Sequence, residues 1–440
     1  MRSKEGVKQA VLQEISARQE QLLAVAEKLW QQPETGYREV RSAAYAAEIL
    51  QTLGLEVRTG LALTGFRADW DSGRPGPTVA VLGEMDALLL PSHPAADPQT
   101  GAVHACGHHA HLTTMLGVAM GLLGAVKGEE LSGRVAFVGT PAEEGIELDY
   151  RLGLLRSGKI QAIMGKAALI REGVFSDIDI ALMNHVGEYP FCVADFNGTI
   201  KKKIIFRGRS CHASTPHKGI NALNAVNLAL HAVALLRESY GNDDRIRMHG
   251  IISHGGDAVN IVPDHVTLEY QLRADTLPKL RSLNARFDRA MVHCALALDA
   301  QVEITSLPTA MPLRNDDELA RMFAAAVAEV VPGTEVQVKQ SFNPGCTDMG
   351  DLSQIMPVLH GGVPGAGAWH SIDFAIHDPG LAIIANAQVL ALMLVELLYG
   401  DASCGRAVAA GKSSCLPLAD YLAQVDSLGE VVHSEDCKRL

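Results

Sequence analysis

Three pieces of sequence between residues 79 and 123 indicate the architecture of this chain: Val79-Ala-Val-Leu-Gly-Glu-Met-Asp-Ala-Leu88, His104-Ala-Cys-Gly-His-His-Ala-His111 and Leu112-Thr-Thr-Met-Leu-Gly-Val-Ala-Met-Gly-Leu-Leu123. The first is apolar and strand-like, the third is helix-like, and the second holds four imidazoles and a thiol. Imidazole nitrogens and thiolates bind zinc-like metals well. A surface loop that is rich in histidine by chance is the alternative. We favour an enzyme metal site at a strand-to-helix junction of an α/β sheet.

Helical and β-like segments alternate on both sides of this stretch. Apolar residues recur at three- and four-residue steps over 7–31, and a second helical segment covers 38–53. This order predicts an α/β fold with a mainly parallel sheet and helices on both faces. The other expected segments are strands at 55–58, 66–70, 78–83 and 134–139 and helices at 316–330 and 381–399.

The middle of the chain predicts a different unit. Its segments follow the order β-α-β-β-α-β, which is the ferredoxin-like split unit. We expect an inserted domain at 193–310 and a catalytic domain formed by 1–192 and 311–440. Residues 401–440 would be a C-terminal extension with one helix near 416–428. The segments are 195–207, 221–240, 246–253, 265–273, 277–299 and 301–306.

The bulk composition narrows the classes of function. A chain of 440 residues exceeds the size of one core, so two domains are expected. The net charge of −12 argues against a nucleic-acid partner. The N-terminus shows no apolar signal segment, and the apolar stretches 115–126 and 389–398 are too short to span a membrane. Eight scattered cysteines predict reduced thiols and a cytoplasmic protein.

Four further segments offer residues for a metal site. Pro141-Ala-Glu-Glu-Gly145 follows an apolar strand, so one carboxylate can bind a metal while its neighbour acts as general base. By contrast, Glu129-Glu130 is interpreted as a solvated pair. The other three segments each contain a histidine: Asn184-His185-Val186, Cys211-His-Ala-Ser-Thr-Pro-His217 and Trp369-His370-Ser371.

Taken together, these motifs resemble the amidohydrolase branch of the aminoacylase/carboxypeptidase metallopeptidases. The resemblance implies that the α/β domain has the zinc-exopeptidase-like form of the fold. They occur in the family's order, from Pro33-Glu34-Thr35-Gly36-Tyr37 to about residue 399. The resemblance implies that Glu143 is the general base for metal-activated water. It also implies one or two divalent ions, for which manganese, zinc, cobalt and nickel remain open. The ligands it implies are Cys106, His108, Glu144, His185 and His370.

The resemblance implies further roles outside the ligand set. Asp86 would orient a ligating imidazole. His212, in the inserted domain, would reach a neighbouring subunit's cleft and polarise the scissile carbonyl. This role predicts self-association through the inserted domain into a dimer or larger oligomer. Asn260 and Arg273 would bind a substrate carboxylate, although a surface strand charge explains Arg273 equally well.

His109 departs from the family pattern, because the family usually has aspartate at this position. Losing a carboxylate there puts full two-metal occupancy in doubt. The late motif Gly345-Cys-Thr-Asp-Met-Gly-Asp351 is closer to the aminobenzoyl-glutamate-hydrolase pattern. We therefore expect hydrolysis of a C–N bond in a small, carboxylate-bearing, aromatic substrate. The alternative is an aromatic aminohydrolase of the 5-nitroanthranilate type, which releases ammonia. A non-catalytic binding protein is disfavoured, because the whole motif set is present.

Overall fold

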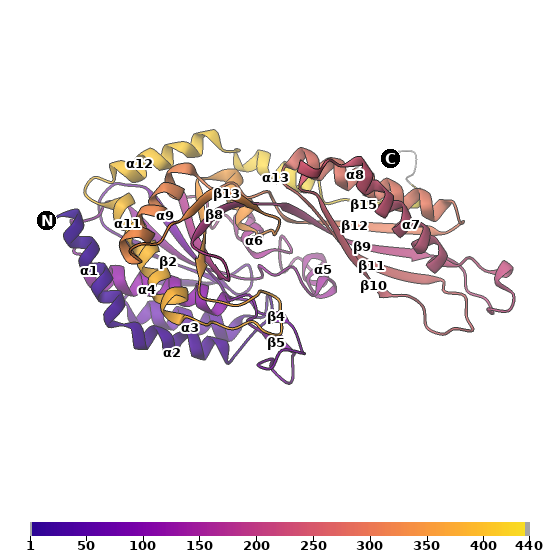
Figure 1. Ribbon diagram of the computed structural model, residues 1–440, viewed down its shortest axis with the longest axis horizontal. Helices are drawn as coiled ribbons and strands as arrows, with labels where there is room; N and C mark the ends of the chain where they lie inside the picture. The colour runs from indigo at the N-terminus through magenta and orange to yellow at the C-terminus, as the bar shows by residue number, and fades with distance from the viewer. Residues whose placement is uncertain (1, 436–440) are drawn as a thin grey trace. The chain divides into compact units, whose positions relative to one another are not determined.

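The computed structural model describes residues 2–435, and these fall into two compact units (Figure 1). The first unit contains the chain up to Asp195, Arg314–Phe342 and Asp351–Leu416. The second contains Phe196–Leu313, Asn343–Gly350 and the chain from Pro417 onward. The inserted domain expected at 193–310 extends from Phe196 to Leu313. Asn343–Gly350 and the chain from Pro417 to Glu435 also belong to the second unit, so the expectation that 311–440 lies wholly in the catalytic domain is wrong for these segments. The segment from Pro417 joins the sheet of the second unit, and residues 436–440 lie outside the described residues.

An eight-stranded mixed sheet forms the centre of the first unit. Its order is β1-β2-β6-β3-β7-β14-β8-β13. The four central strands are parallel, and antiparallel pairs flank them. The strands are β1 Val57–Leu61, β2 Gly65–Asp71, β3 Thr78–Glu84, β6 Arg134–Thr140, β7 Ile180–Gly187, β8 Cys192–Phe196, β13 Gln337–Asn343 and β14 Val358–Pro364, with a separate pair, β4 Leu88–Leu89 and β5 Ala102–Val103.

Helices pack around this sheet and complete its core. The helix α4 contacts β3, α1 and α11, and its buried residues extend without a break from His108 to Leu122. The single helix expected over 7–31 is two helices that meet at Arg18, where neither glycine nor proline marks the break. The helices are α1 Lys4–Ala17, α2 Gln19–Trp30, α3 Val40–Thr52, α4 His108–Ala125, α5 Leu148–Arg156, α6 Gly165–Arg171, α9 Asp317–Val330, α10 Met349–Ile355, α11 Asn386–Leu398 and α12 Ser403–Ala410.

One apolar helical segment, Gly380–Leu398, is long and apolar enough to cross a membrane by length and composition. It agrees with the helix expected over 381–399, and it extends beyond the ten-residue apolar stretch 389–398, because α11 is preceded by a π-helical stretch, Gly380–Ala385. In the folded chain 83% of its 18-residue window is buried. This helix is therefore part of the core of the first unit.

A five-stranded antiparallel sheet forms the second unit, with the order β10-β11-β9-β12-β15. The first four strands and two helices reproduce the expected split β-α-β-β-α-β unit. Both helices pack on the sheet and on each other, and they enclose one apolar core (Figure 1). The elements are β9 Gly198–Arg207, α7 Ala222–Leu236, β10 Arg247–His254, β11 His265–Ala274, α8 Leu277–Leu296, β12 Gln301–Ala310, α13 Leu418–Asp426 and β15 Val431–His433.

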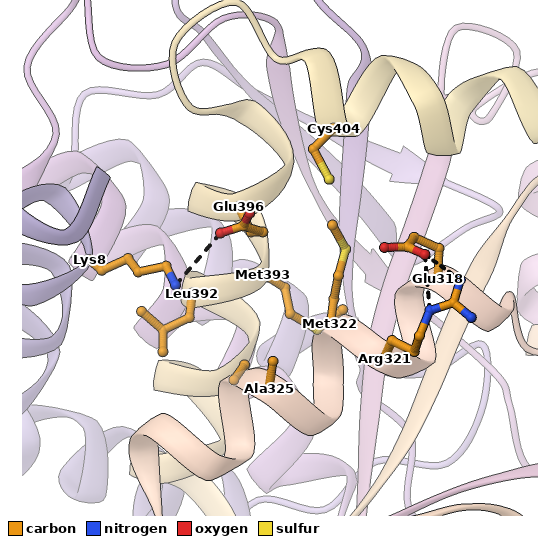
Figure 2. A pocket seen from close by; sticks show the side chains of 10 residues that line it. Lys8, Glu318, Arg321, Met322, Ala325, Leu392, Met393, Glu396 and Cys404 are labelled. Carbon is orange, nitrogen blue, oxygen red and sulfur yellow. Dashed lines mark hydrogen bonds and ion pairs between the residues drawn. The ribbon is translucent and has the colours of Figure 1, made fainter. Parts of the chain in front are cut away.

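A pocket of about 290 Å³ lies in the first unit among α1, α9, α11 and α12 (Figure 2). Its charged side chains pair with one another: Lys8 lies 3.6 Å from Glu396, and Arg321 pairs with Glu318. None of the residues predicted from the sequence to act in catalysis lines it. This pocket is therefore separate from the site that the sequence predicts.

Candidate metal centre

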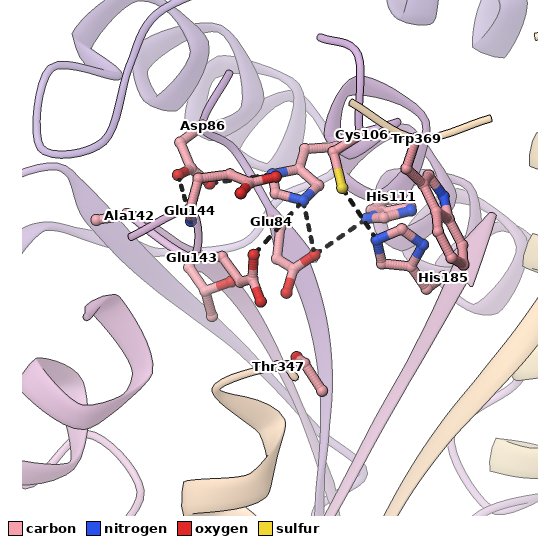
Figure 3. A network of polar contacts seen from close by, with 12 residues as sticks. Glu84, Asp86, Cys106, His111, Ala142, Glu143, Glu144, His185, Thr347 and Trp369 are labelled. Atoms are coloured by element: carbon pink, nitrogen blue, oxygen red, sulfur yellow. Dashed lines mark hydrogen bonds and ion pairs between the residues drawn. The ribbon is translucent and has the colours of Figure 1, made fainter. Parts of the chain in front are cut away.

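The predicted site residues of the first unit gather at the carboxyl ends of the parallel strands (Figure 3). Asp86 follows β3, Glu143 and Glu144 follow β6, and His185 lies near the end of β7. The helix α4 begins at His108. Open α/β sheets place their ligand sites at this edge, because all parallel strands end there.

Gly107 makes the close approach of Cys106 and His108 to β7 possible. Its φ of 91° is left-handed, a conformation that glycine adopts at little cost. A Cβ atom at this position would lie 2.6 Å from a methyl carbon of Val186. Glycine is thus required here both by backbone conformation and by space.

Hydrogen bonds orient the His108 ring. Its Nδ1 lies 3.0 Å from Asp86 Oδ1, and Asp86 Oδ2 accepts the backbone N–H of Glu144 at 2.9 Å. With Nδ1 beside Asp86, Nε2 is the nitrogen that faces the cluster. Burial would lower the pKa of His108, but the Glu84 carboxylate and Cys106 raise it well above its usual value, so a metal ion must displace the proton of Nε2. This Nε2 is buried and makes no hydrogen bond within the described residues. Asp86 therefore has the geometry of the orienting carboxylate that the sequence predicted.

The five predicted metal ligands form one cluster. The donor atoms of Cys106, His108 and Glu144 all lie within 4.8 Å of one another. His185 Nε2 lies 3.5 Å from Cys106 Sγ, and His370 Nε2 lies 3.1 Å from Glu144 Oε1. Because His185 Nδ1 bonds to the Val186 carbonyl at 2.9 Å, its Nε2 also faces the cluster. Two imidazoles, a thiol and a carboxylate, with a third imidazole at the rim, fit a divalent transition metal.

The electrostatics of the cluster agree with a cation site. Burial alone would raise the pKa of Glu144, but His370 and His108 lower it to about 2. Burial lowers the pKa of His185 well below its usual value, so the ring is neutral and its Nε2 can donate a lone pair. Burial and the Glu144 carboxylate raise the pKa of the Cys106 thiol well above its usual value. Metal binding must therefore displace the thiol proton.

Glu143 lies beside the ligand cluster. Its Oε2 is 4.0 Å from His108 Nε2, and its side chain is 13% exposed while His108 is fully buried. The carboxylate thus faces the donor cluster and is still reached by solvent. This is the geometry that a general base for an attacking water needs.

A buried network that the sequence reasoning missed lies behind the cluster. Lys166 Nζ donates to Glu84 Oε1 at 2.7 Å, and both side chains are fully buried. His111 Nδ1 lies 3.1 Å from Glu84 Oε2, and the Val186 N–H donates to His111 Nε2 at 3.1 Å. Because Nε2 accepts, Nδ1 must carry the proton. Both nitrogens of His111 are therefore used, and it is not available as a ligand.

The ionisation of this network follows from its contacts. Burial would raise the pKa of Glu84, but Lys166, His108 and His111 lower it well below its usual value. Glu84 was visible in the sequence as the carboxylate that ends an apolar strand. Lys166 gave no comparable signal, because a lysine within an apolar helix is normally a solvated side chain.

His370 has an unusual backbone. Its φ of 56° is left-handed, which few residues other than glycine adopt. Two hydrogen bonds hold the segment: the His370 N–H donates to the Ala105 carbonyl at 2.9 Å, and Trp369 Nε1 donates to the Val186 carbonyl at 2.7 Å. Such strain is typical of functional positions.

His109 and His104 lie outside the donor cluster. The His109 ring packs 5.0 Å from Trp30 and 5.3 Å from His104, measured between ring centroids. Burial lowers the pKa of His109 well below its usual value, and lowers that of His104 to about 3. Both rings are therefore neutral and serve as packing groups.

The predicted residues of the inserted domain lie in the second unit. His212 is exposed, with Nδ1 2.7 Å from Ser214 Oγ, and its segment forms a β-bridge to Ile261, next to Asn260. Asn260 is also exposed. Arg273 on β11 donates to Gln271 Oε1 at 3.1 Å. The roles of these three residues remain predictions.

The sheet and its buried donor cluster define the class of protein as an α/β metallohydrolase. Residues 80–395 match the model of peptidase family M20/M25/M40, and the chain belongs to this family. The resemblance seen in the sequence is thereby confirmed. The chain is accordingly a metal-dependent hydrolase that acts on amide- or peptide-type C–N bonds.

Individual relatives show the range of the family. The chain is 28% identical to a Xaa-Arg dipeptidase of Mus musculus, covering 80% of this chain and 79% of the relative. It is 29% identical to one of the subunits of p-aminobenzoyl-glutamate hydrolase of Escherichia coli, over 66% of this chain and 58% of the relative. Among solved structures, a dinuclear metal-binding peptidase of Bacillus subtilis matches with a TM-score of 0.65 and 21% identity, over 87% of this chain and 99% of that one.

Proposed function

We propose that this protein is an amidohydrolase that cleaves a C–N bond in a small, carboxylate-bearing, aromatic substrate, with Glu143 as general base. The observation that carries the proposal is the position of Glu143, partly exposed beside a buried cluster of metal-binding side chains. Aromatic preference is supported by the aminobenzoyl-glutamate hydrolase relative. It is also supported by Trp369, whose ring lies 5.2 Å from His185 and 5.0 Å from Tyr189.

In this proposal each residue has a defined task. A bound divalent ion would polarise the scissile group and make water a stronger acid. Glu143 takes a proton from the attacking water and delivers it to the leaving nitrogen. Asp86 keeps His108 in the tautomer that presents Nε2. His212 donates a hydrogen bond to the developing oxyanion, and Asn260 and Arg273 hold the substrate carboxylate.

The metal is proposed as one or two ions of manganese, zinc, cobalt or nickel. Cys106, His108, Glu144, His185 and His370 would hold it. Thiolate and imidazole donors favour these ions over magnesium or calcium. The dinuclear peptidase of the same fold supports two ions. The expectation of a single ion depended on His109, whose ring lies outside the donor cluster.

Self-association through the inserted domain is also proposed. The edge strand β10 carries Ile251 and Ile252, which are 56% and 43% exposed, and α7 carries Leu228 and Leu235, which are 39% and 56% exposed. Exposed apolar side chains on an open sheet edge are typical of a pairing surface. His212 would then act from a partner subunit or after domain closure.

A cytoplasmic location is also proposed. The described cysteines are free thiols, which supports a reducing compartment.

The aromatic aminohydrolase alternative gains no support from the structure. It depended on His109 as a changed group beside the metals. His109 instead packs against Trp30, outside the donor cluster. We therefore propose the amidase alone.

The test combines metal analysis with a substrate panel of N-acyl amino acids, aminobenzoyl-glutamate and substituted anthranilates. Both amine and ammonia release are measured. We expect amine release from an aromatic amide, with one or two metal equivalents per chain. Ammonia release without any amide cleavage would refute the amidase proposal. Full turnover by the Glu143→Gln variant on the same substrate would refute the role of Glu143.

A further inference from the structure

The segment from Pro417 to Glu435, which we call the tail, contributes no residue to the candidate metal centre. Within the second unit its strand β15 pairs antiparallel with the middle of β12: Glu303 pairs with His433, Ile304 with Val432 and Thr305 with Val431. The tail thereby becomes the terminal strand of the sheet on the β12 side, while β10 is the terminal strand on the other.

Two hydrogen bonds extend this pairing beyond the three strand residues. The N–H of Ser306 donates to the Glu430 carbonyl at 2.9 Å. At the other end, the N–H of Val302 donates to Ser434 Oγ at 3.2 Å. The tail therefore covers β12 from residue 302 to residue 306.

The tail leaves no donor open along this part of β12. Hydrogen-bonded and non-bonded pairs alternate in an antiparallel ladder. Because Ser306 donates outward to the tail, Ile304 and Val302 also face outward. The next outward position is Pro308, which has no N–H. Each outward position from Val302 to Pro308 is thus either bonded to the tail or lacks a donor.

Side-chain packing holds the tail in place. Val432 is 8% exposed and belongs to the same apolar core as Val302 and Ile304. Through Val432 the tail is thus packed on the second unit as well as hydrogen-bonded to it.

We propose that the tail is a built-in cap on the β12 edge, and that it restricts strand-to-strand association to the β10 edge. An open strand edge is a template for pairing with another chain, and natural proteins cover such edges. Without the tail, β12 would present a ten-residue edge strand to a second copy of this chain. With it, the terminal strand on that side is the three-residue β15, and very short edge strands are a device that disfavours pairing with another chain. Association through β10 therefore ends at a pair of subunits. The second half of this proposal rests on the self-association proposed above.

The pairing of β15 with β12 allows two full-length proline variants to be compared, one at a hydrogen-bonded position of β15 and one at the neighbouring non-bonded position. Val432 faces Ile304 in a bonded pair, so Val432→Pro removes the central N–H that bonds to β12. Val431 is in a non-bonded pair, and its N–H points away from the sheet. Proline is tolerated at such a position. Val431→Pro is therefore the control.

The experiment measures mass against concentration by analytical ultracentrifugation, with circular dichroism as a check of folding. We expect Val432→Pro to show a mass that rises with concentration above that of the wild type, and Val431→Pro to match the wild type. A folded Val432→Pro variant with wild-type mass at every concentration overturns the cap. An equal rise in both variants also overturns it.

Hydrogen exchange of the wild-type protein keeps the test independent of variant folding. In the monomeric protein at low concentration, the amides of Val302, Ile304 and Ser306 should exchange at least about tenfold more slowly than the outward amides of β10, which are then unpaired with a second subunit. Equal rates would overturn the cap. A wild type that is monomeric at every concentration would refute self-association through β10. Association of Val432→Pro would still support the cap in that case.

Discussion

Replacing Lys166 by methionine removes the positive charge beside Glu84 while nearly preserving the volume of the side chain. Both groups are fully buried, and Nζ lies 2.7 Å from Oε1. At this separation two unit charges attract by about 6 kcal/mol if the effective dielectric constant is ~20. Removing one partner of a buried pair costs about 3–5 kcal/mol, because the other charge stays buried. His111 still donates to Glu84, so we expect a loss of about 3 kcal/mol.

Denaturant unfolding followed by tryptophan fluorescence measures this loss. All three tryptophans, Trp30, Trp70 and Trp369, belong to the first unit, so the signal reports on the unit that contains the pair. A chelator keeps the protein metal-free, because a bound ion would add its own stabilisation. The Glu84→Gln variant and the double variant complete a double-mutant cycle.

Two outcomes would contradict the reasoning. A cost below about 1 kcal/mol for Lys166→Met would mean that Glu84 does not remain as a buried unpaired charge. An equal cost in the wild-type and Glu84→Gln backgrounds would show that lost packing, not the ion pair, causes the effect.

Three further predictions concern catalysis, metal and pH. Glu143→Gln should lower kcat by about 10²–10⁴-fold and leave the metal content unchanged. Removing the metal should lower the melting temperature of the tryptophan transition, and re-addition should restore it, whereas Cys106→Ser should bind the metal more weakly. Burial and the Asp86 carboxylate raise the pKa of Glu39 to about 8 from 4.5, so the folded state keeps a proton that the unfolded chain releases. Stability should therefore fall as the pH rises between these values, by an amount on the order of 5 kcal/mol, and Glu39→Gln should remove the fall.

Each of these predictions has a contrary outcome. Loss of metal from Glu143→Gln would make it a ligand and not only a base. If a chelator leaves the melting temperature unchanged, the metal does not bind to the buried donor cluster of the folded protein. Glu39 accepts hydrogen bonds from Thr64 and from the Ala142 N–H at 2.6 and 2.7 Å, and glutamine can keep the second. An unchanged pH dependence in Glu39→Gln would mean that Glu39 is not the group that titrates.

Much of the candidate site could be predicted because its residues follow apolar strands. Glu144 and His185 come directly after or within such strands, and parallel strands bring their carboxyl ends together. The orienting role of Asp86 came from the family resemblance, and the structure has its carboxylate 3.0 Å from His108 Nδ1. Lys166 could not be predicted, because its partner Glu84 is 82 residues away in sequence and nothing local marks the lysine as buried.

The fold could be predicted where local patterns decide it, and not where distant pairing does. The split β-α-β-β-α-β unit was expected, since each of its elements has its own periodicity. The strand β15 was not expected, because three residues make too short a pattern to recognise. Its identity as a strand depends on β12, more than a hundred residues earlier. For the same reason the tail was assigned to the wrong unit.

The left-handed glycine between Cys106 and His108 has a consequence for how this chain can change. Its position tolerates no side chain, since Val186 occupies the space and the backbone disfavours other residues. Cys106 can be exchanged for another donor without moving the chain, whereas the spacing between the two donors cannot. The metal preference of this fold can therefore change when a donor side chain is replaced. The spacing between the two donors cannot change, because Gly107 fixes it although it binds no metal itself.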